Sequence, residues 1–179
     1  MSNPFTRARL MGLALAVVVY GADQWVKWAM IYRLSLRAVR HIDVLPFFDF
    51  TWAENYGVSL GMLTASSMEM RWILVAVTGL IALTVLVWLM REKARWDIAA
   101  LGLILGGAMG NIHDRFSVGY VVDYADFHIG TFRPFLIFNL ADVAITIGVV
   151  IILARALFLR EKQDNPPESQ PADMAAETP

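Results

Sequence analysis

The chain contains no cysteine among its 179 residues. It therefore has no disulfide framework, no thiol nucleophile and no cysteine-based metal site, and it cannot be lipidated on a cysteine of its own. Charged residues are also scarce, at 17%, whereas a soluble domain usually has about a quarter. The net charge is −1, and because this lacks the basic excess of nucleic-acid-binding proteins, we expect no nucleic-acid partner.

Apolar residues make up 58% of the chain and form four long stretches, at 10–30, 72–90, 98–115 and 135–159. At about 1.5 Å per residue, such stretches match the roughly 30 Å hydrocarbon core of a bilayer. The sequence therefore predicts an all-α membrane protein with four transmembrane helices. Pro134 suits the first turn of the last helix.

The first apolar stretch has an alternative interpretation as a cleavable signal peptide. No A-x-A cleavage site follows it, and Trp25, Lys27 and Trp28 are typical of an interfacial anchor. We therefore interpret it as a retained helix.

Orientation is indicated by basic residues near the ends of the stretches. We expect both termini, and one set of these basic residues, to lie on the cytoplasmic side of the membrane. The set consists of Arg7, Arg9, Arg91, Lys93, Arg95, Arg160 and Lys162. The opposite loops also contain arginines, so the bias is incomplete.

Two segments between the helices resemble strands. Apolar and polar residues alternate over 48–53, and 117–133 is also extended, with Gly130 suited to a hairpin turn. We expect a small extracytoplasmic β-element resting on the helices. Residues 1–161 are then a single catalytic transmembrane domain, and the polar, proline-rich residues 162–179 are a disordered cytoplasmic tail.

Asp142 is the residue that least suits its surroundings, because it falls within the fourth apolar stretch. An intramembrane carboxylate is costly and is usually either a packing residue with a hydrogen-bonding partner or part of a functional site. A helix that begins at Pro134 would place Asp142 roughly 12 Å into the membrane, with Asn139 on the same face.

Further polar residues occur toward the external ends of the other stretches, namely Asp23, Lys27, Asn111, Asp114, Arg115 and, just beyond the third stretch, Asp123. The glycines 102, 106 and 110 form a small-xxx-small ladder that allows a neighbouring helix to approach closely. Carboxylates from several helices would then meet at one depth. When two carboxyl groups lie this near each other, they share a proton. One can then serve as general base and the other as general acid in peptide hydrolysis.

At these residues the chain resembles the lipoprotein signal peptidases, or signal peptidase II, a bacterial family of intramembrane aspartyl proteases. The matching elements are Asp23 with Lys27, "NYGVSLG", "GGAMGNIHDR", "VVDYADF" and "FNLAD". The resemblance implies that Asp123 and Asp142 are catalytic. It implies substrate-binding or supporting roles for Asp23, Lys27, Asn55, Gly57, Asn111, Asp114, Arg115 and Asn139. The family usually has phenylalanine where Leu60 and Tyr124 stand, and His113 is an unusual residue in its block.

The resemblance also implies the reaction. Such an enzyme removes the signal peptide from diacylglyceryl-modified prolipoproteins, cutting before the lipidated cysteine, on the extracytoplasmic side of the bacterial inner membrane. It contacts membrane lipid, needs no metal or other cofactor, and is inhibited by globomycin-type cyclic peptides.

Two other functions are compatible with parts of the sequence. "GVSLG" matches G-x-S-x-G and would make Ser59 a serine nucleophile, but His41, His113 and His128 show no triad context. The intramembrane aspartates could instead form a proton relay in a small membrane transporter, although no inverted repeat is present. We interpret His41, His128, Asp126 and Glu54 as solvated or locally hydrogen-bonded residues.

Overall fold

A computed structural model describes residues 4–57 and 68–161 of the chain. The elements in chain order are α1 (Pro4–Trp28), which continues into the π-helical turn η1 (Ala29–Arg33), α2 (Leu36–Val39), β1 (His41–Leu45), β2 (Phe48–Asn55), α3 (Met68–Arg91), α4 (Arg95–Ser117), β3 (Val121–Phe127) and α5 (Leu140–Glu161). The predicted serine nucleophile Ser59, Leu60 and the tail 162–179 lie outside the described residues.

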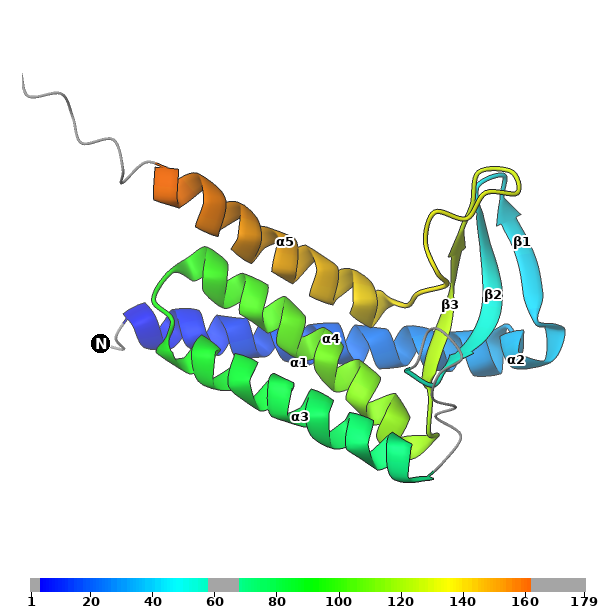
Figure 1. Cartoon of the computed structure of the whole chain (residues 1–179), viewed down its shortest axis with the longest axis horizontal. Coiled ribbons are helices and arrows are strands. Elements are labelled where there is room, and N and C mark those ends of the chain that lie inside the picture. Colours follow the sequence, from blue (N-terminus) through cyan, green and yellow to red (C-terminus); the bar gives the residue numbers. More distant parts are fainter. Residues whose placement is uncertain (1–3, 58–67, 162–179) are drawn as a thin grey trace, which may run out of the picture.

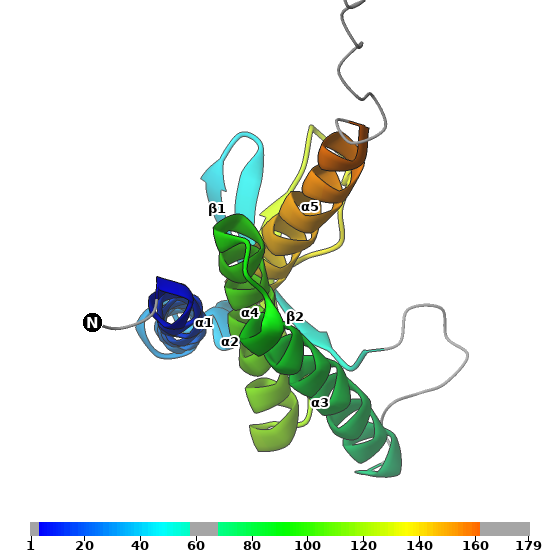
Figure 2. The ribbon, with the colours of Figure 1, turned by 90° about the vertical axis from the view of Figure 1, so that its left-hand side faces the viewer.

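The four long helices lie side by side, and the strands stand at one end of them (Figures 1 and 2). Helix α4 is central, because it packs against α1, α3 and α5. A Cβ atom on Gly102 or Gly106 would lie 2.5 Å from a carbonyl oxygen of α1. The close helix approach predicted from these glycines is therefore confirmed, with α1 as the partner helix.

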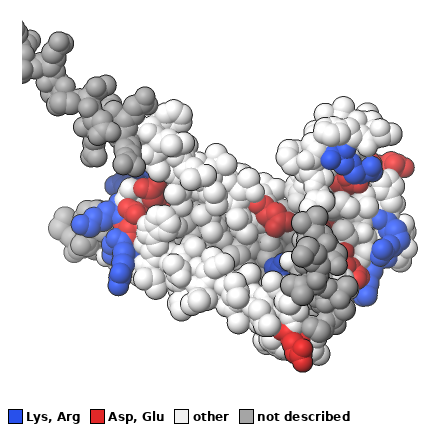
Figure 3. All heavy atoms as spheres, viewed as in Figure 1, with Lys and Arg blue, Asp and Glu red and all other residues white. Residues whose placement is uncertain are grey.

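Three helical segments are long and apolar enough to cross a membrane: Thr6–Arg33, Met68–Arg91 and Leu140–Phe158. They carry many exposed large apolar side chains, such as Val17, Leu80 and Leu153. On the face shown in Figure 3, charged side chains gather toward the two ends of the molecule, and the surface between them is largely uncharged. This is the arrangement of a membrane protein, and three of the four predicted spans correspond to helices long and apolar enough to cross a membrane.

The strands form one antiparallel sheet in the order β1-β2-β3. Its buried side chains pack on the end of the first helix through Met30, Leu36, Trp52, Tyr120, Val122 and Tyr124. The predicted turn at Gly130 is present, because Ile129 and Phe132 pair across it and Gly130 has φ +61°. The strand predicted at 48–53 is confirmed within β2, whereas β1 was not predicted.

The predicted start of the last helix is wrong, because α5 begins at Leu140 and not at Pro134. Phe138 pairs with Ala125 of β3, its backbone N–H lying 3.1 Å from the Ala125 carbonyl oxygen. The segment before Leu140 is thus held against the sheet and cannot join the helix. Asp142 consequently lies in the first turn of α5 rather than about 12 Å into a span.

Candidate active site

Asp142 is part of the cap that starts α5. Asn139 precedes the helix, and its side-chain Oδ1 accepts a hydrogen bond from the Asp142 backbone N–H at 3.0 Å. In return, Asp142 Oδ2 accepts from the Asn139 backbone N–H at 3.2 Å. This reciprocal pair is a capping box, which satisfies two backbone donors that would otherwise be orphaned at the helix start. Asn139 and Asp142 are therefore fixed in place by the backbone itself.

Asp123 comes from β3 and is buried, with 2% of its surface exposed. Its Oδ2 accepts from Asn55 Nδ2 at 3.0 Å, and its Oδ1 accepts from Asn139 Nδ2 at 2.6 Å. Asn139 thus bonds both aspartates, Asp123 through its side chain and Asp142 through its backbone N–H. One asparagine holds a strand carboxyl group and a helix carboxyl group beside each other.

Asn111 of α4 completes this network. Its Nδ2 donates to Asp142 Oδ1 at 2.8 Å, and its Oδ1 accepts from Asn139 Nδ2 at 3.2 Å. Both oxygens of Asp142 therefore have donors. The same Asn111 oxygen also accepts from Lys27 Nζ at 3.3 Å, which joins the aspartate pair to the first helix.

The environment of Asp123 favours its neutral form. Burial, and then the nearby charge of Asp142, raise the pKa of Asp123 to about 6, although the hydrogen bonds from Asn55 and Asn139 oppose the shift. Asp123 therefore titrates close to neutral pH. Such a carboxyl group can hold and release a proton under physiological conditions.

Lys27 lies at the centre of a buried ion cluster, here called the Lys27 cluster, with Asp23 and Asp114. Its Nζ lies 2.8 Å from Asp23 Oδ2 and 2.7 Å from Asp114 Oδ2, and the three side chains are at most 7% exposed. Gln24 adds hydrogen bonds to both carboxylates, at 3.3 and 3.0 Å. The interpretation of Lys27 as an interfacial anchor is wrong, because α1 packs closely enough on α4 to enclose it.

The two carboxylates of the Lys27 cluster also hold backbone next to the aspartate pair. Asp23 Oδ1 accepts from the Ala141 N–H at 3.0 Å, one residue before Asp142. Asp114 Oδ2 accepts from the Val122 N–H at 3.1 Å, one residue before Asp123. The cluster therefore fixes the start of α5 and the start of β3 relative to each other.

Glycines allow this close assembly. A Cβ on Gly110 would collide with the Asp23 carboxylate, and a Cβ on Gly107 would collide with the Ala141 carbonyl oxygen. The backbones of α1 and α5 consequently approach α4 at the level of the cluster.

Arg115 and Gly57 lie at the edge of the network. Gly57 has φ +87°, and its N–H donates to Asn55 Oδ1 at 2.8 Å, so the turn here requires glycine. A Cβ on Gly57 would lie 3.4 Å from the Arg115 guanidinium. Arg115 is attracted by the charges of Asp123 and Asp142, and its buried Nε has no hydrogen-bond partner within 4–57 and 68–161.

The structure thus brings together all ten residues that the resemblance selected: Asp23, Lys27, Asn55, Gly57, Asn111, Asp114, Arg115, Asp123, Asn139 and Asp142. Sequence reasoning missed Gln24, which is adjacent to Asp23 but carries no charge. It also missed the hydroxyl of Tyr124, which accepts from the Leu140 N–H at 3.1 Å at the start of α5. The pattern N-x-x-D at 139–142 is a helix-start signal that could have placed this boundary.

The histidines do not converge on this site. His113 lies 2.7 Å from the Tyr20 hydroxyl through its Nδ1, and His41 and His128 contact residues of the sheet. The Ser59 hypothesis gains no histidine partner from these contacts.

Comparison with known proteins identifies the relatives of the chain. The model of the family described as signal peptidase (SPase) II matches residues 15–158. The lipoprotein signal peptidase of Sphingopyxis alaskensis is 52% identical over 160 residues, covering 89% of this chain and 91% of the relative. That of Rhizorhabdus wittichii is 53% identical over 161 residues, covering 90% and 94%.

A solved structure shows the same fold. A bacterial membrane enzyme determined by the in meso method at 2.3 Å resolution superimposes with a TM-score of 0.70 at 26% sequence identity. The match covers 89% of this chain and 94% of that enzyme.

Proposed function

The chain belongs to the signal peptidase II family of aspartic proteases, and we propose that it removes the signal peptide from diacylglyceryl-modified prolipoproteins with Asp123 and Asp142 as its catalytic pair. The hypothesis of a transporter or proton relay is not retained, because the family is one of proteases. The observation that carries the assignment of the pair is the position of Asn139, which bonds both aspartates.

The proposed reaction uses the two carboxyl groups in different protonation states. Asp123 is the proton carrier, because burial and the charge of Asp142 raise its pKa to about 6. Asp142, in its ionised form, takes a proton from a water molecule as that water attacks the scissile carbonyl carbon. Asp123 donates its proton to the carbonyl oxygen. The tetrahedral intermediate then collapses as Asp142 passes the proton taken from water to the leaving nitrogen, and Asp123 recovers a proton from a hydroxyl group of the intermediate. The bond between the signal peptide and the cysteine nitrogen is thereby hydrolysed.

The other residues act by position. Asp23 and Asp114 hold the backbone beside each catalytic aspartate, and Lys27 balances part of their charge. Asn55, Asn111 and Asn139 orient the carboxyl groups by donating to their oxygens.

Arg115 and Gly57 lie next to each other at the edge of the network around the pair, and we assign them to substrate contact. The Nε of Arg115 has no hydrogen-bond partner among the residues that the structure describes, and it is a donor that a peptide carbonyl oxygen can engage.

We propose that α4 is the fourth membrane span. Its 23 residues extend about 34 Å, and it is enclosed by three helices that are apolar enough to cross a membrane. The described ends of the chain lie at the same end of the helices in Figure 1, as an even number of spans requires. Arg7, Arg9, Arg91, Lys93 and Arg95 favour a cytoplasmic location for that end and an extracytoplasmic one for the sheet. Residues 1–161 would then form one catalytic domain in the bacterial inner membrane.

The start of α5 sets the depth of the proposed site. The apolar span of α5 begins at Leu140, so Asp142 lies near the extracytoplasmic surface of the membrane. A diacylglyceryl group keeps a modified cysteine at that level, because each buried methylene contributes about 0.8 kcal/mol to membrane affinity. Large apolar side chains are exposed on the segment before α5, at Ile129, Phe132, Phe135 and Leu136, and we assign them to contact with lipid.

The substrate must present an extended peptide to the pair, because an amide inside a helix is inaccessible. We therefore propose that the signal peptide unwinds beside Asp123 and Asp142 while its acyl chains lie between the helices. A globomycin-type cyclic peptide would inhibit by presenting a hydroxyl group to both carboxyl groups.

The experiment that tests the catalytic pair is cleavage of a diacylglyceryl-modified prolipoprotein by purified enzyme. Asp142→Asn keeps the shape of the side chain but cannot exchange the proton, so turnover should be lost. Asp97→Asn is the matched control, since Asp97 is an aspartate of α4 that pairs with Arg155 and does not contact the site. Substantial turnover by Asp142→Asn would refute the assignment.

The lipid requirement is tested with the same assay on unmodified prolipoprotein. The unmodified substrate lacks the anchor that holds its cysteine at the membrane surface, so we expect far slower cleavage. Equal rates on the two substrates would show that the diacylglyceryl group is not recognised.

A further inference from the structure

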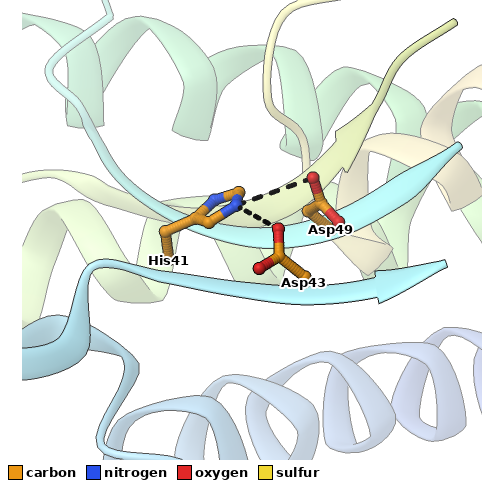
Figure 4. Close-up of side chains that lie close together, drawn as sticks. All are labelled: His41, Asp43 and Asp49. Atoms are coloured by element: carbon orange, nitrogen blue, oxygen red, sulfur yellow. Dashed lines mark hydrogen bonds and ion pairs between the residues drawn. The ribbon is translucent and has the colours of Figure 1, made fainter. Parts of the chain in front are cut away.

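The sheet carries a second polar cluster, at the end where β1 meets β2 (Figure 4). His41 Nε2 lies 3.1 Å from Asp43 Oδ1 and 3.7 Å from Asp49 Oδ2. His128 Nε2 lies 2.8 Å from the same Asp49 oxygen. We call these four residues the histidine–aspartate cluster. None of them contributes to the contacts of the aspartate pair described above.

The hydrogen bonds around His41 constrain the protonation of its ring nitrogens. Thr51 Oγ1 donates to Asp126 Oδ2 at 3.1 Å, and the Asp126 carboxylate is held by Arg133 Nε at 3.0 Å. Because the Thr51 hydroxyl proton is committed, His41 Nδ1 must donate to Thr51 Oγ1, at 2.9 Å. His41 Nε2 also makes a hydrogen-bond contact with Asp43 Oδ1 at 3.1 Å, and because a carboxylate can only accept, either a second ring proton or a metal ion must lie between these two atoms.

The same reasoning applies to His128. Its Nδ1 lies 3.2 Å from the Gly130 carbonyl oxygen, which can only accept, so the proton of the neutral ring is on Nδ1. The Nε2 lone pair then faces the Asp49 carboxylate. Although the two atoms are 2.8 Å apart, the buried Nε2 makes no hydrogen bond to any described residue. A protonated ring would be expected to align its N–H with that oxygen.

The two imidazole nitrogens and the two carboxylates therefore require a positive charge among them, which ring protons or a metal ion can supply. We propose that the histidine–aspartate cluster binds a divalent transition-metal ion through His41 Nε2 and the carboxylates of Asp43 and Asp49, with His128 beside the Asp49 carboxylate and outside the ligand set. A mixed set of imidazole and carboxylate ligands suits Zn²⁺. An ion of charge +2 also balances the two carboxylates.

The geometry fits such an ion. Bonds of about 2.0–2.1 Å in a tetrahedral zinc site place the ligand atoms about 3.3 Å apart. The ligand atoms of His41, Asp43 and Asp49 all lie within 4.8 Å of one another. His41 Nε2 lies 3.1 and 3.7 Å from the two carboxylate oxygens, on either side of the tetrahedral value. His41 also directs its other ring nitrogen outward, to Thr51 Oγ1, as metal-bound histidines do.

The ion would join β1 and β2, and the segment after β3 would lie beside it. His41 and Asp43 belong to β1, Asp49 to β2, and His128 follows β3. Asp49 pairs with Asp126, which lies three residues, or about 10 Å, along β3 from Asp123. The ion would stiffen the sheet that carries Asp123 without touching the reacting atoms.

The test measures zinc binding by the full chain, purified without a histidine tag and stripped with a chelator. After addition of Zn²⁺ and dialysis, bound metal is counted by mass spectrometry, and affinity is measured by competition with a chromophoric chelator. We expect one zinc ion per chain and a higher thermal unfolding temperature when it is bound.

Variants locate the ion. His41→Gln and Asp49→Asn should each weaken zinc binding by about tenfold or more, and Thr51→Ala, which removes only the partner of His41 Nδ1, should weaken it less. His113→Gln is the matched control, because His113 is outside the cluster and bonded to Tyr20. It should keep one zinc ion with unchanged affinity.

Zinc content no higher than that of the stripped protein would overturn the proposal, whatever the variants do. Equal affinity in His41→Gln and the unchanged chain would overturn it too. An unfolding temperature that responds to acid but not to zinc would indicate that protons, and not a metal ion, separate the histidines from the carboxylates. None of these readouts depends on peptide cleavage, so the proposed function can fail independently.

Discussion

Ion pairs of aspartate with a basic residue connect the helices at two positions along α4, and these two connections differ in burial and in what they hold. The Lys27 cluster reaches α4 at Asp114, whereas the Asp97–Arg155 pair reaches it 17 residues earlier, about 25 Å away. The Lys27 cluster is almost entirely enclosed, whereas the side chains of Asp97 and Arg155 are 23% and 27% exposed.

The difference shows that the structural role of an aspartate ion pair depends on its burial and its other partners, and not on the residue types alone. Asp23 and Asp114 also accept backbone N–H groups beside the aspartate pair, and water cannot replace their partners. Asp97 and Arg155 have water as an alternative partner, so their attraction is screened. The Lys27 cluster therefore sets the geometry of the proposed active site, and the Asp97–Arg155 pair is a local contact between α4 and α5.

Lys27→Met should have the largest effect on stability. It leaves Asp23 and Asp114 buried without their cation, which we expect to destabilise the fold by about 3–5 kcal/mol. Thermal or denaturant unfolding of the purified variant measures this loss. Combining Lys27→Met with Asp114→Asn removes one of the uncompensated charges and should recover part of the stability. A Lys27→Met variant as stable as the unchanged chain would show that the cluster is not important for folding.

Tyr124→Phe gives a smaller effect at the junction of sheet and helix. The hydroxyl group accepts the Leu140 N–H at the first residue of α5, and phenylalanine leaves that donor unsatisfied. We expect a loss of about 1 kcal/mol in stability, with the aspartate pair otherwise intact. A loss much greater than this, measured by chemical denaturation, would mean that the hydroxyl group has a further role.

Asp97→Asn should have the smallest effect. The pair with Arg155 is partly solvated, so its removal should cost less than about 1 kcal/mol and leave turnover unchanged. If unfolding experiments instead showed a loss like that of Lys27→Met, the contrast between the two connections would disappear.

The parts of the molecule that sequence reasoning predicted correctly are those set by local patterns. Long apolar stretches identified the helices, and the glycines of α4 identified its close contact with α1. The candidate site residues came from the resemblance of Asp23 with Lys27, "NYGVSLG", "GGAMGNIHDR", "VVDYADF" and "FNLAD" to the family, and their catalytic and supporting roles stay predictions.

The features that were missed depend on contacts between distant residues. The start of α5 is set by the pairing of Phe138 with Ala125, because apolar residues at 135–138 suit a helix equally well. The burial of Lys27 requires α1 and α4 to meet, and the histidine–aspartate cluster requires β1, β2 and the end of β3. No local pattern in the sequence contains that information.

The titration of Asp123 separates catalysis from folding. Because its folded-state pKa is raised from 3.8 to about 6, the favourable contribution of its neutral form is present at low pH and is lost as the pH rises through about 6. The free energy of unfolding that this pKa shift removes between low and high pH is roughly 3 kcal/mol for this 2% exposed group. Asparagine does not ionise, so Asp123→Asn should gain stability relative to the unchanged chain between pH 4.5 and pH 8.

Turnover of a diacylglyceryl-modified prolipoprotein by Asp123→Asn, measured beside its unfolding stability at those two pH values, tests the central claim most directly. The account predicts a variant that remains folded, whose relative stability rises with pH, and that has no measurable turnover. Turnover comparable to that of the unchanged chain would contradict the assignment of Asp123 and Asp142 as the catalytic pair.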